Sequence, residues 1–182
     1  MSELLTSVSE ISQTNRLVIS PEYSGHSQAS LEELFVETDS GQYIQKNVVI
    51  DKANQVDLTA TAARIGVVIT TTTGPVHGLM GVHDGKWDIA LNIDLDIAGQ
   101  QYVFGHELGH IALIMHFLAW GSSEIPAYLD RVNQEPDFYR YTEAFCDYFS
   151  GRVLDAVYPS TLPRRAVPRR PAPVEQLRLV ME

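Results

Sequence analysis

Residues 97–120 read IAGQQYVFGHELGHIALIMHFLAW, a run that is apolar on nearly every side and is predicted to form one helix. A helix that is apolar all round belongs inside a protein, so we expect this one to lie at the centre of the core. His106, Glu107 and His110 fall within it, and burying such polar groups without partners is costly. The segment therefore predicts a buried helix whose polar residues have partners inside the protein.

His106 and His110 are four residues apart, which places them on one face of the predicted helix. Two neutral imidazoles in this register can share a zinc ion, and catalytic zinc sites keep one position open for water. Glu107 follows the first histidine, where its carboxylate can take a proton from that water. The pattern predicts one catalytic zinc per chain, with Glu107 as the base. The alternative is a histidine pair that is satisfied by ordinary hydrogen bonds.

A third zinc ligand is expected from a second predicted helix, which begins near Tyr141 and runs to about Ala156. Glu143 and Asp147 are four residues apart there and share a face. We predict that Glu143 binds zinc and that Asp147 accepts a hydrogen bond from the outer nitrogen of a ligand histidine. Without the upstream motif, two acidic residues facing solvent would be the simpler interpretation.

Two other residues compete for the ligand role. His116 follows His110 by six residues, the metzincin spacing, but Leu113 stands where that pattern needs glycine. Six residues on a continuous helix rotate by about 240°, which points His116 away from the metal. We interpret His116 as a packing or surface histidine, with a metzincin-like site as the alternative. Cys146 is interpreted as a small buried hydrophobic residue.

A resemblance to the ImmA/IrrE family of metallopeptidases is carried by two motifs, His106-Glu107-Leu108-Gly109-His110 and Glu143-x-x-Cys146-Asp147-x-Phe149-Ser150. The second motif also resembles the corresponding helix of thermolysin-type gluzincins. Weaker similarity extends upstream over 56–68, 78–81 and 88–92, so the resemblance covers about residues 56–157. This chain has Gly105 where the family often has alanine.

The resemblance implies a zinc endopeptidase, a peptide hydrolase that cleaves a DNA-binding transcriptional repressor. The likeness to gluzincins implies that Asp147 pairs with His106. A protein that binds and sequesters a repressor, with zinc in a structural role only, is the alternative. Structural zinc sites are closed by four protein ligands, whereas three are visible here and Glu107 would have no role.

We expect an α+β, zincin-like fold in which a small mixed sheet lies over the zinc helix and a second helix supplies Glu143. Residues 66–72 are rich in β-branched side chains, and 87–93 alternate between apolar and polar, so both are predicted strands. The strand at 87–93 is either an edge that holds an extended peptide or an internal strand. Asp57 is a good N-cap for a short helix that ends at Arg64.

Three regions are expected along the chain. Residues 1–55 form an N-terminal extension packed on or flanking the domain, with a helix near Ser30–Glu37, a strand near Tyr43–Ile50 and no helix-turn-helix. Residues 56–158 form the metallopeptidase domain. Residues 159–182 form an arm rich in proline and arginine: a disordered end, a docking arm or a segment that occupies the cleft.

Charge and composition restrict the partners. The net charge of −10 argues against direct binding to nucleic acid and suits a basic protein substrate, such as a helix-turn-helix repressor. A single cysteine excludes an intramolecular disulfide and predicts a reducing, cytoplasmic compartment. No apolar run reaches membrane-spanning length without a polar interruption, so no membrane association is expected.

Peptide hydrolysis also needs a hydrogen-bond donor to the oxyanion of the tetrahedral intermediate. Tyrosine and histidine can supply it. The sequence does not choose among five candidates for this substrate-contacting role, which are Tyr128, Tyr139, Tyr141, His77 and His83.

Overall fold

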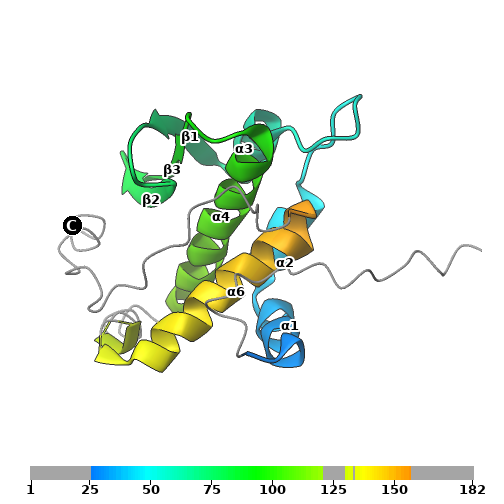
Figure 1. Cartoon of the computed structure of the whole chain (residues 1–182). Helices are drawn as coiled ribbons and strands as arrows, with labels where there is room; N and C mark the ends of the chain where they lie inside the picture. The colour runs from blue at the N-terminus through cyan, green and yellow to red at the C-terminus, as the bar shows by residue number, and fades with distance from the viewer. Residues whose placement is uncertain (1–25, 121–129, 133, 157–182) are drawn as a thin grey trace, which may run out of the picture.

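The computed structural model describes residues 26–120, 130–132 and 134–156. Their elements are, in chain order, α1 (Gln28–Glu37), α2 (Asp39–Lys46), α3 (Leu58–Ile65), β1 (Val67–Thr72), β2 (Gly78–His83), β3 (Lys86–Asn92), α4 (Ile97–Trp120) and α6 (Pro136–Leu154) (Figure 1). The fold is mixed α+β with a small three-stranded sheet, as expected. Residues 1–25, Tyr128 and the arm at 159–182 lie outside the described residues.

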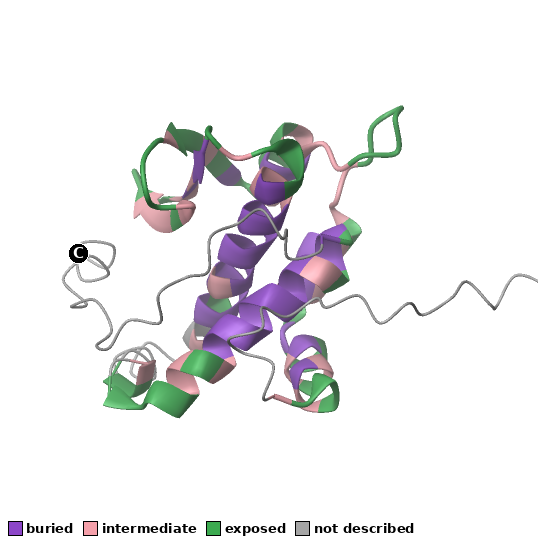
Figure 2. Ribbon diagram, in the orientation of Figure 1, coloured by how far each residue is buried: buried purple, intermediate pink, exposed green. Residues whose placement is uncertain are grey.

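Two long helices, α4 and α6, form the centre of the molecule. They pack against each other along most of their lengths, and the buried residues of the protein concentrate on them (Figure 2). Most of their buried apolar side chains belong to one core cluster, which includes Val103, Phe104, Leu108, Leu113, Phe145 and Phe149. The predicted helix at 97–120 is confirmed over its whole length. In the described part of the chain, no helix combines the length and apolarity needed to cross a membrane.

The sheet has the strand order β1-β3-β2, with β1 parallel and β2 antiparallel to β3. The strand predicted at 87–93 is therefore internal, and it is β1 and β2 that lie at the edges. Ile89 and Leu91 of β3 are buried in the same core cluster as α4. A tight turn joins β2 to β3 through Asp84 and Gly85, which both have positive φ (50° and 71°), as a type I′ turn requires.

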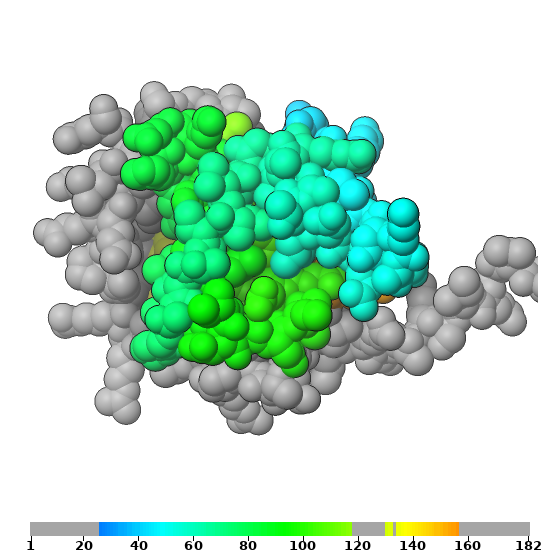
Figure 3. Space-filling model, turned by 90° about the horizontal axis from the view of Figure 1, so that it is seen from above, coloured from blue at the N-terminus to red at the C-terminus, as the bar shows by residue number. Residues whose placement is uncertain are grey.

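The helix before the sheet, α3, is bounded by a capping residue at each end. Asp57 caps α3 by accepting a hydrogen bond from the Ala60 backbone nitrogen at 2.9 Å. Gly66 ends α3 in the left-handed region with φ 78°, and β1 begins at the next residue. The expected short helix and the strand after it are confirmed. Seen from above, α3 and the strands cover this end of the molecule (Figure 3).

The strand predicted at 43–50 is wrong, because residues 39–46 form α2. Tertiary packing explains the helix: Ile44 is buried, and Gly41 lies against the rings of Phe149 and Phe35. The β-branched residues come after the helix, and Ile50 forms an isolated bridge with Val56. The helix expected near 30–37 is confirmed as α1. Both N-terminal helices thus add side chains to the same core as α4 and α6.

Candidate metal centre

The backbones of α4 and α6 come very close together at two glycines of α4. A Cβ atom on Gly109 would lie 2.8 Å from the Cα atom of Cys146, and one on Gly105 would lie 2.9 Å from the Cα atom of Ser150. No side chain larger than hydrogen fits at these contacts without a shift of the helices. The pairing of 105 with 150 and 109 with 146 makes the helices antiparallel. It brings the polar side chains beside these glycines face to face.

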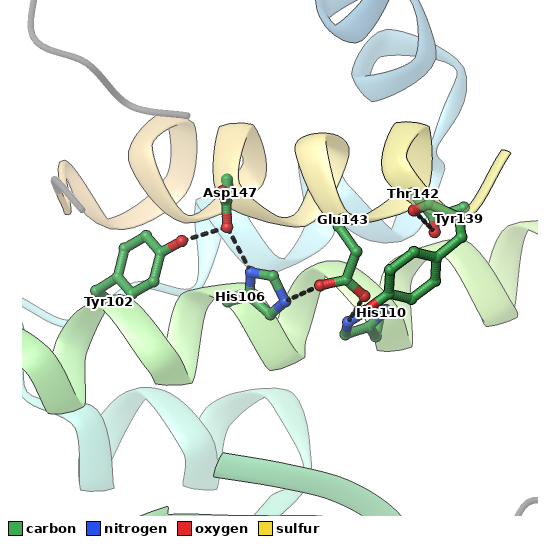
Figure 4. A network of polar contacts seen from close by, with 7 residues as sticks. All are labelled: Tyr102, His106, His110, Tyr139, Thr142, Glu143 and Asp147. Carbon is green, nitrogen blue, oxygen red and sulfur yellow. Dashed lines mark hydrogen bonds and ion pairs between the residues drawn. The ribbon is translucent and has the colours of Figure 1, made fainter. Parts of the chain in front are cut away.

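His106 is fully buried and is anchored by a carboxylate of the other helix. Its Nδ1 atom lies 2.7 Å from Oδ1 of Asp147, which is also buried (Figure 4). Because a carboxylate accepts hydrogen bonds, Nδ1 carries the ring proton and donates it. The lone pair of His106 is then on Nε2, the tautomer that a metal ligand needs. Asp147 thus contacts the histidine that the likeness to gluzincins assigned to it.

The two histidines of the motif converge on one carboxylate. Nε2 of His106 lies 3.5 Å from Oε2 of Glu143, and Nε2 of His110 lies 3.5 Å from Oε1 of the same residue (Figure 4). The ring centroids of the histidines are 4.9 Å apart. The side chain of His110 is 22% exposed, while those of His106 and Glu143 are nearly inaccessible. The three groups therefore surround one place that opens to solvent on the side of His110.

Cys146 lies at the same place. Its Sγ atom and one ring nitrogen of each histidine are all within 4.8 Å of one another, so this buried group could hold a metal ion. The interpretation of Cys146 as a buried hydrophobic residue was incomplete: it is buried, but it is also within reach of the histidines. A sequence signal existed, because Cys146 follows Glu143 by three residues and so lies on an adjoining face of the helix.

Two donor sets therefore overlap, one completed by Glu143 and the other by Cys146. Glu143 was the ligand expected from the sequence, and the geometry around it is as follows. The hydrogen bond to Asp147 leaves Nε2 of His106 as the nitrogen available to a metal, and Nε2 is the atom that faces Glu143. Two nitrogens and one carboxylate oxygen are donors that suit zinc.

Glu107 is buried and lies on the sheet side of α4. Its Cγ atom is 3.5 Å from the position that a Cβ atom on Gly78 would take. Gly78 is the first residue of the edge strand β2. The carboxylate expected to act as base therefore stands between the histidine helix and one end of an edge strand.

Tyr102 is a further residue of the centre, and sequence reasoning missed it. Its hydroxyl donates to Oδ1 of Asp147, the oxygen that also accepts from His106 (Figure 4). The signal that could have found it is its position one turn before His106, on the same helix face.

Two of the tyrosines proposed as oxyanion donors are on α6, on different faces. Tyr139 lies one turn before Glu143, and its ring points toward His110 in Figure 4. Tyr141 faces α1 instead: its hydroxyl donates to the Ser30 carbonyl at 3.4 Å. Burial raises the pKa of Tyr141 above its ordinary value, with a smaller opposing effect of that hydrogen bond. Of these two, Tyr139 is the one whose ring points toward the histidines.

The two histidine candidates lie at opposite ends of β2. His83 is the last residue of the strand, with its side chain 81% exposed and next to Asp84. His77 directly precedes Gly78, the residue beside Glu107. At about 3.4 Å per strand residue, His83 lies roughly 17 Å along the strand from that point. His77 is therefore the histidine candidate whose backbone lies closer to Glu107.

His116 is buried and packs edge-on against the ring of Phe117, with 5.7 Å between the centroids. Within the described ranges, the group that could hold a metal consists of His106, His110 and Cys146, and it includes neither His116 nor Glu143. Glu143 differs from His116 in that its carboxylate lies 3.5 Å from Nε2 of each of these histidines. The placement of His116 gives no support to a metzincin-like arrangement.

Comparison with protein-family models, with curated proteins and with solved structures finds no match to this chain. Any function must therefore be argued from the chemistry of the site, since a fold by itself does not specify one.

Proposed function

We propose that this protein is a zinc-dependent endopeptidase that hydrolyses a peptide bond in a protein substrate. The observation that carries the proposal is the convergence of the two histidine Nε2 atoms on Glu143, each at 3.5 Å, with Glu107 adjacent in sequence to His106. Peptidases that use one zinc ion need such a set of three protein ligands and a nearby base.

His106, His110 and Glu143 would hold the metal ion. When bound, zinc supplies Lewis-acid chemistry, because it polarises a carbonyl oxygen and makes water more acidic. His110 is the partly exposed member of the set, so substrate would approach from its side. The nearly complete burial of His106 and Glu143 keeps bulk water away from the other side and strengthens electrostatic interactions there.

Glu107 would act as the general base. Its carboxylate would take a proton from the attacking water and deliver it to the nitrogen of the leaving amine. An extended peptide that pairs with β2, the edge strand that begins beside Glu107, would bring main-chain amides to this carboxylate. Main-chain pairing of this kind holds a peptide with little sequence preference.

The proposed substrate is a DNA-binding transcriptional repressor. Two considerations support it: the resemblance of the two motifs to the ImmA/IrrE family, and the net charge of −10, which favours a basic protein partner over nucleic acid. The His77 and Tyr139 side chains are the described candidates for contacting the substrate carbonyl.

The test is a cleavage assay on helix-turn-helix proteins encoded next to this chain, read by mass spectrometry. Purified protein is compared before and after zinc removal by a chelator, and after zinc is restored. Cleavage that disappears with the metal and returns with it is the expected result. Intact substrates under all three conditions would contradict the proposed activity.

A second candidate is a zinc-binding protein that sequesters a repressor without cutting it. The position of Cys146 favours it, because a thiolate in addition to His106, His110 and Glu143 would give the four ligands of a closed, structural site. Cobalt substitution separates the two candidates. A thiolate-to-cobalt charge-transfer band that vanishes in Cys146→Ala would indicate the closed site, and its absence would favour the open one.

A further inference from the structure

A buried tyrosine hydroxyl points at the carboxylate that anchors His106. Tyr102 is 1% exposed and lies one turn before His106 on α4. Its hydroxyl donates to Oδ1 of Asp147, and the same oxygen accepts from Nδ1 of His106 at 2.7 Å (Figure 4). The Tyr102 and His106 ring centroids are 6.1 Å apart. The three side chains thus form one continuous chain of hydrogen bonds across the two helices.

Tyr102 is also fixed at its backbone. Its carbonyl oxygen accepts a hydrogen bond from Oγ of Ser150 at 2.9 Å. Ser150 is the residue that lies against Gly105, so this bond is part of one of the two close contacts between α4 and α6. The helix contact that brings Asp147 to His106 therefore also sets where the Tyr102 hydroxyl lies.

The hydrogen bond from Tyr102 helps to stabilise the buried carboxylate of Asp147. A buried carboxylate is costly unless hydrogen bonds compensate for its lost hydration. His106 supplies one donor and Tyr102 supplies a second to the same oxygen. With both donors in place, the carboxylate is held in its orientation toward His106. The ring of His106 then keeps its proton on Nδ1 and its lone pair on Nε2, toward Glu143.

We propose that Tyr102 is a positioning residue of the metal centre, which acts through Asp147 to hold His106 in its ligand tautomer and orientation. The inference rests on the proposed metal centre and does not require peptidase activity. A tyrosine that merely fills the core would need only its ring, so the hydroxyl is the group to remove.

The first measurement is zinc affinity of full-length Tyr102→Phe, by competition with a chelator of known affinity. Phenylalanine keeps the buried ring and removes the bond to Asp147. Affinity should fall about tenfold, because hydrogen bonds to charged groups are the stronger ones in proteins. Tyr148→Phe is the matched control. It also removes a bond from a tyrosine hydroxyl to a carboxylate, that of Glu32, but at the contact with α1.

The second measurement is the tautomer of His106 in the metal-free protein, by ¹⁵N-edited NMR of the imidazole. The wild type should show the Nδ1–H form. Tyr102→Phe should add a population of the Nε2–H form, and Tyr148→Phe should not. In an Asp147→Ala background, Tyr102→Phe should weaken zinc binding no further, because the hydroxyl then has no carboxylate to position.

Three results would overturn the inference: unchanged zinc affinity and tautomer in Tyr102→Phe, an equal loss in Tyr148→Phe, or a further loss in the Asp147→Ala background. Wild-type protein that binds no zinc would instead sink the proposed metal centre. The tautomer measurement would still decide whether Tyr102 positions His106, so the two failures are distinguishable.

Discussion

Gly109 of α4 lies so close to Cys146 of α6 that a methyl group in place of its hydrogen would be 2.8 Å from the Cys146 Cα atom. The contact is between backbones, so rotation of a side chain cannot relieve it. His110 and Glu143 are the adjacent polar residues on the two helices, and they contact each other across this gap. The absence of a side chain at Gly109 therefore allows His110 and Glu143 to meet.

Gly109→Ala should destabilise the protein even though alanine is the better helix former. Helix propensity would favour alanine by about 1 kcal/mol, but overpacking of a tight core contact costs about 1–3 kcal/mol. The variant should also lose zinc affinity, because the helices must move apart. Urea unfolding and zinc titration measure the two effects. Gly81→Ala is the control, because its added carbon would meet no atom within 4 Å.

Alanine at His106, His110 or Glu143 should abolish tight zinc binding, whereas wild-type protein should hold close to one zinc per chain. Each substitution removes one of the three side chains that are proposed to hold the ion. Metal analysis after dialysis gives the stoichiometry. His116→Ala is the control and should keep the metal. Full occupancy in Glu143→Ala would move the third-ligand role to Cys146, or to His116 if its variant loses zinc.

Glu107→Gln should keep the fold and the zinc but lose peptidase activity by about 10²–10⁴-fold, the usual contribution of general base catalysis. Glutamine preserves shape and hydrogen bonding and removes only the ability to take the proton. The measurement is the rate of cleavage of the cognate repressor at equal zinc content. Wild-type turnover in this variant would rule out Glu107 as the base.

Asp147→Ala should weaken zinc affinity or activity by roughly 10–100-fold, less than the loss of a ligand. Its carboxylate bonds His106 at 2.7 Å, so His106 would lose its fixed acceptor. Zinc competition and cleavage assays give the two values. Asp137→Ala changes an exposed aspartate of the same helix and serves as the control. Equal zinc affinity and turnover in both variants would contradict a positioning role for Asp147.

Stability should fall above about pH 10 in part because of Tyr148. Burial, and then the bond to Glu32, raise the pKa of Tyr148 above its ordinary value of 10.0. The folded protein keeps the phenol neutral while the unfolded chain ionises it, so this contribution is complete below about pH 10 and is lost at higher pH. Unfolding of wild type and Tyr148→Phe at about pH 9 and pH 11 tests this. The variant should lose less stability over that interval.

The sequence predicts the structure most accurately where the spacing of apolar residues and their burial agree. The helix at 97–120 is apolar on nearly all sides, and no other placement than the core suits it. Spacing of four residues was enough to group His106 with His110, and Glu143 with Asp147. In the same way, Asp57 and the β-branched run after Gly66 marked α3 and β1.

Contacts between distant segments account for what the sequence did not predict. The strand was expected at 43–50, but Gly41 lies against aromatic rings from α1 and α6 and Ile44 is buried, and this packing favours a helix. The partner of the Tyr102 hydroxyl could not be predicted from spacing along one helix, because this partner, Asp147, is on α6. Cys146 likewise came within reach of the histidines through the close helix contact, which no spacing along one helix reveals.

The polar groups of the centre come from two helices that are far apart in the sequence. His110 and Glu143, for example, contact each other across the two helices. An ion bound by both helices would clamp them, and it would bind the folded chain far better than the unfolded one. Above the dissociation constant, each tenfold rise in free zinc would then add about 1.4 kcal/mol to the free energy of unfolding. The abundance of intact protein in a cell would follow the supply of metal, quite apart from any control of its chemistry.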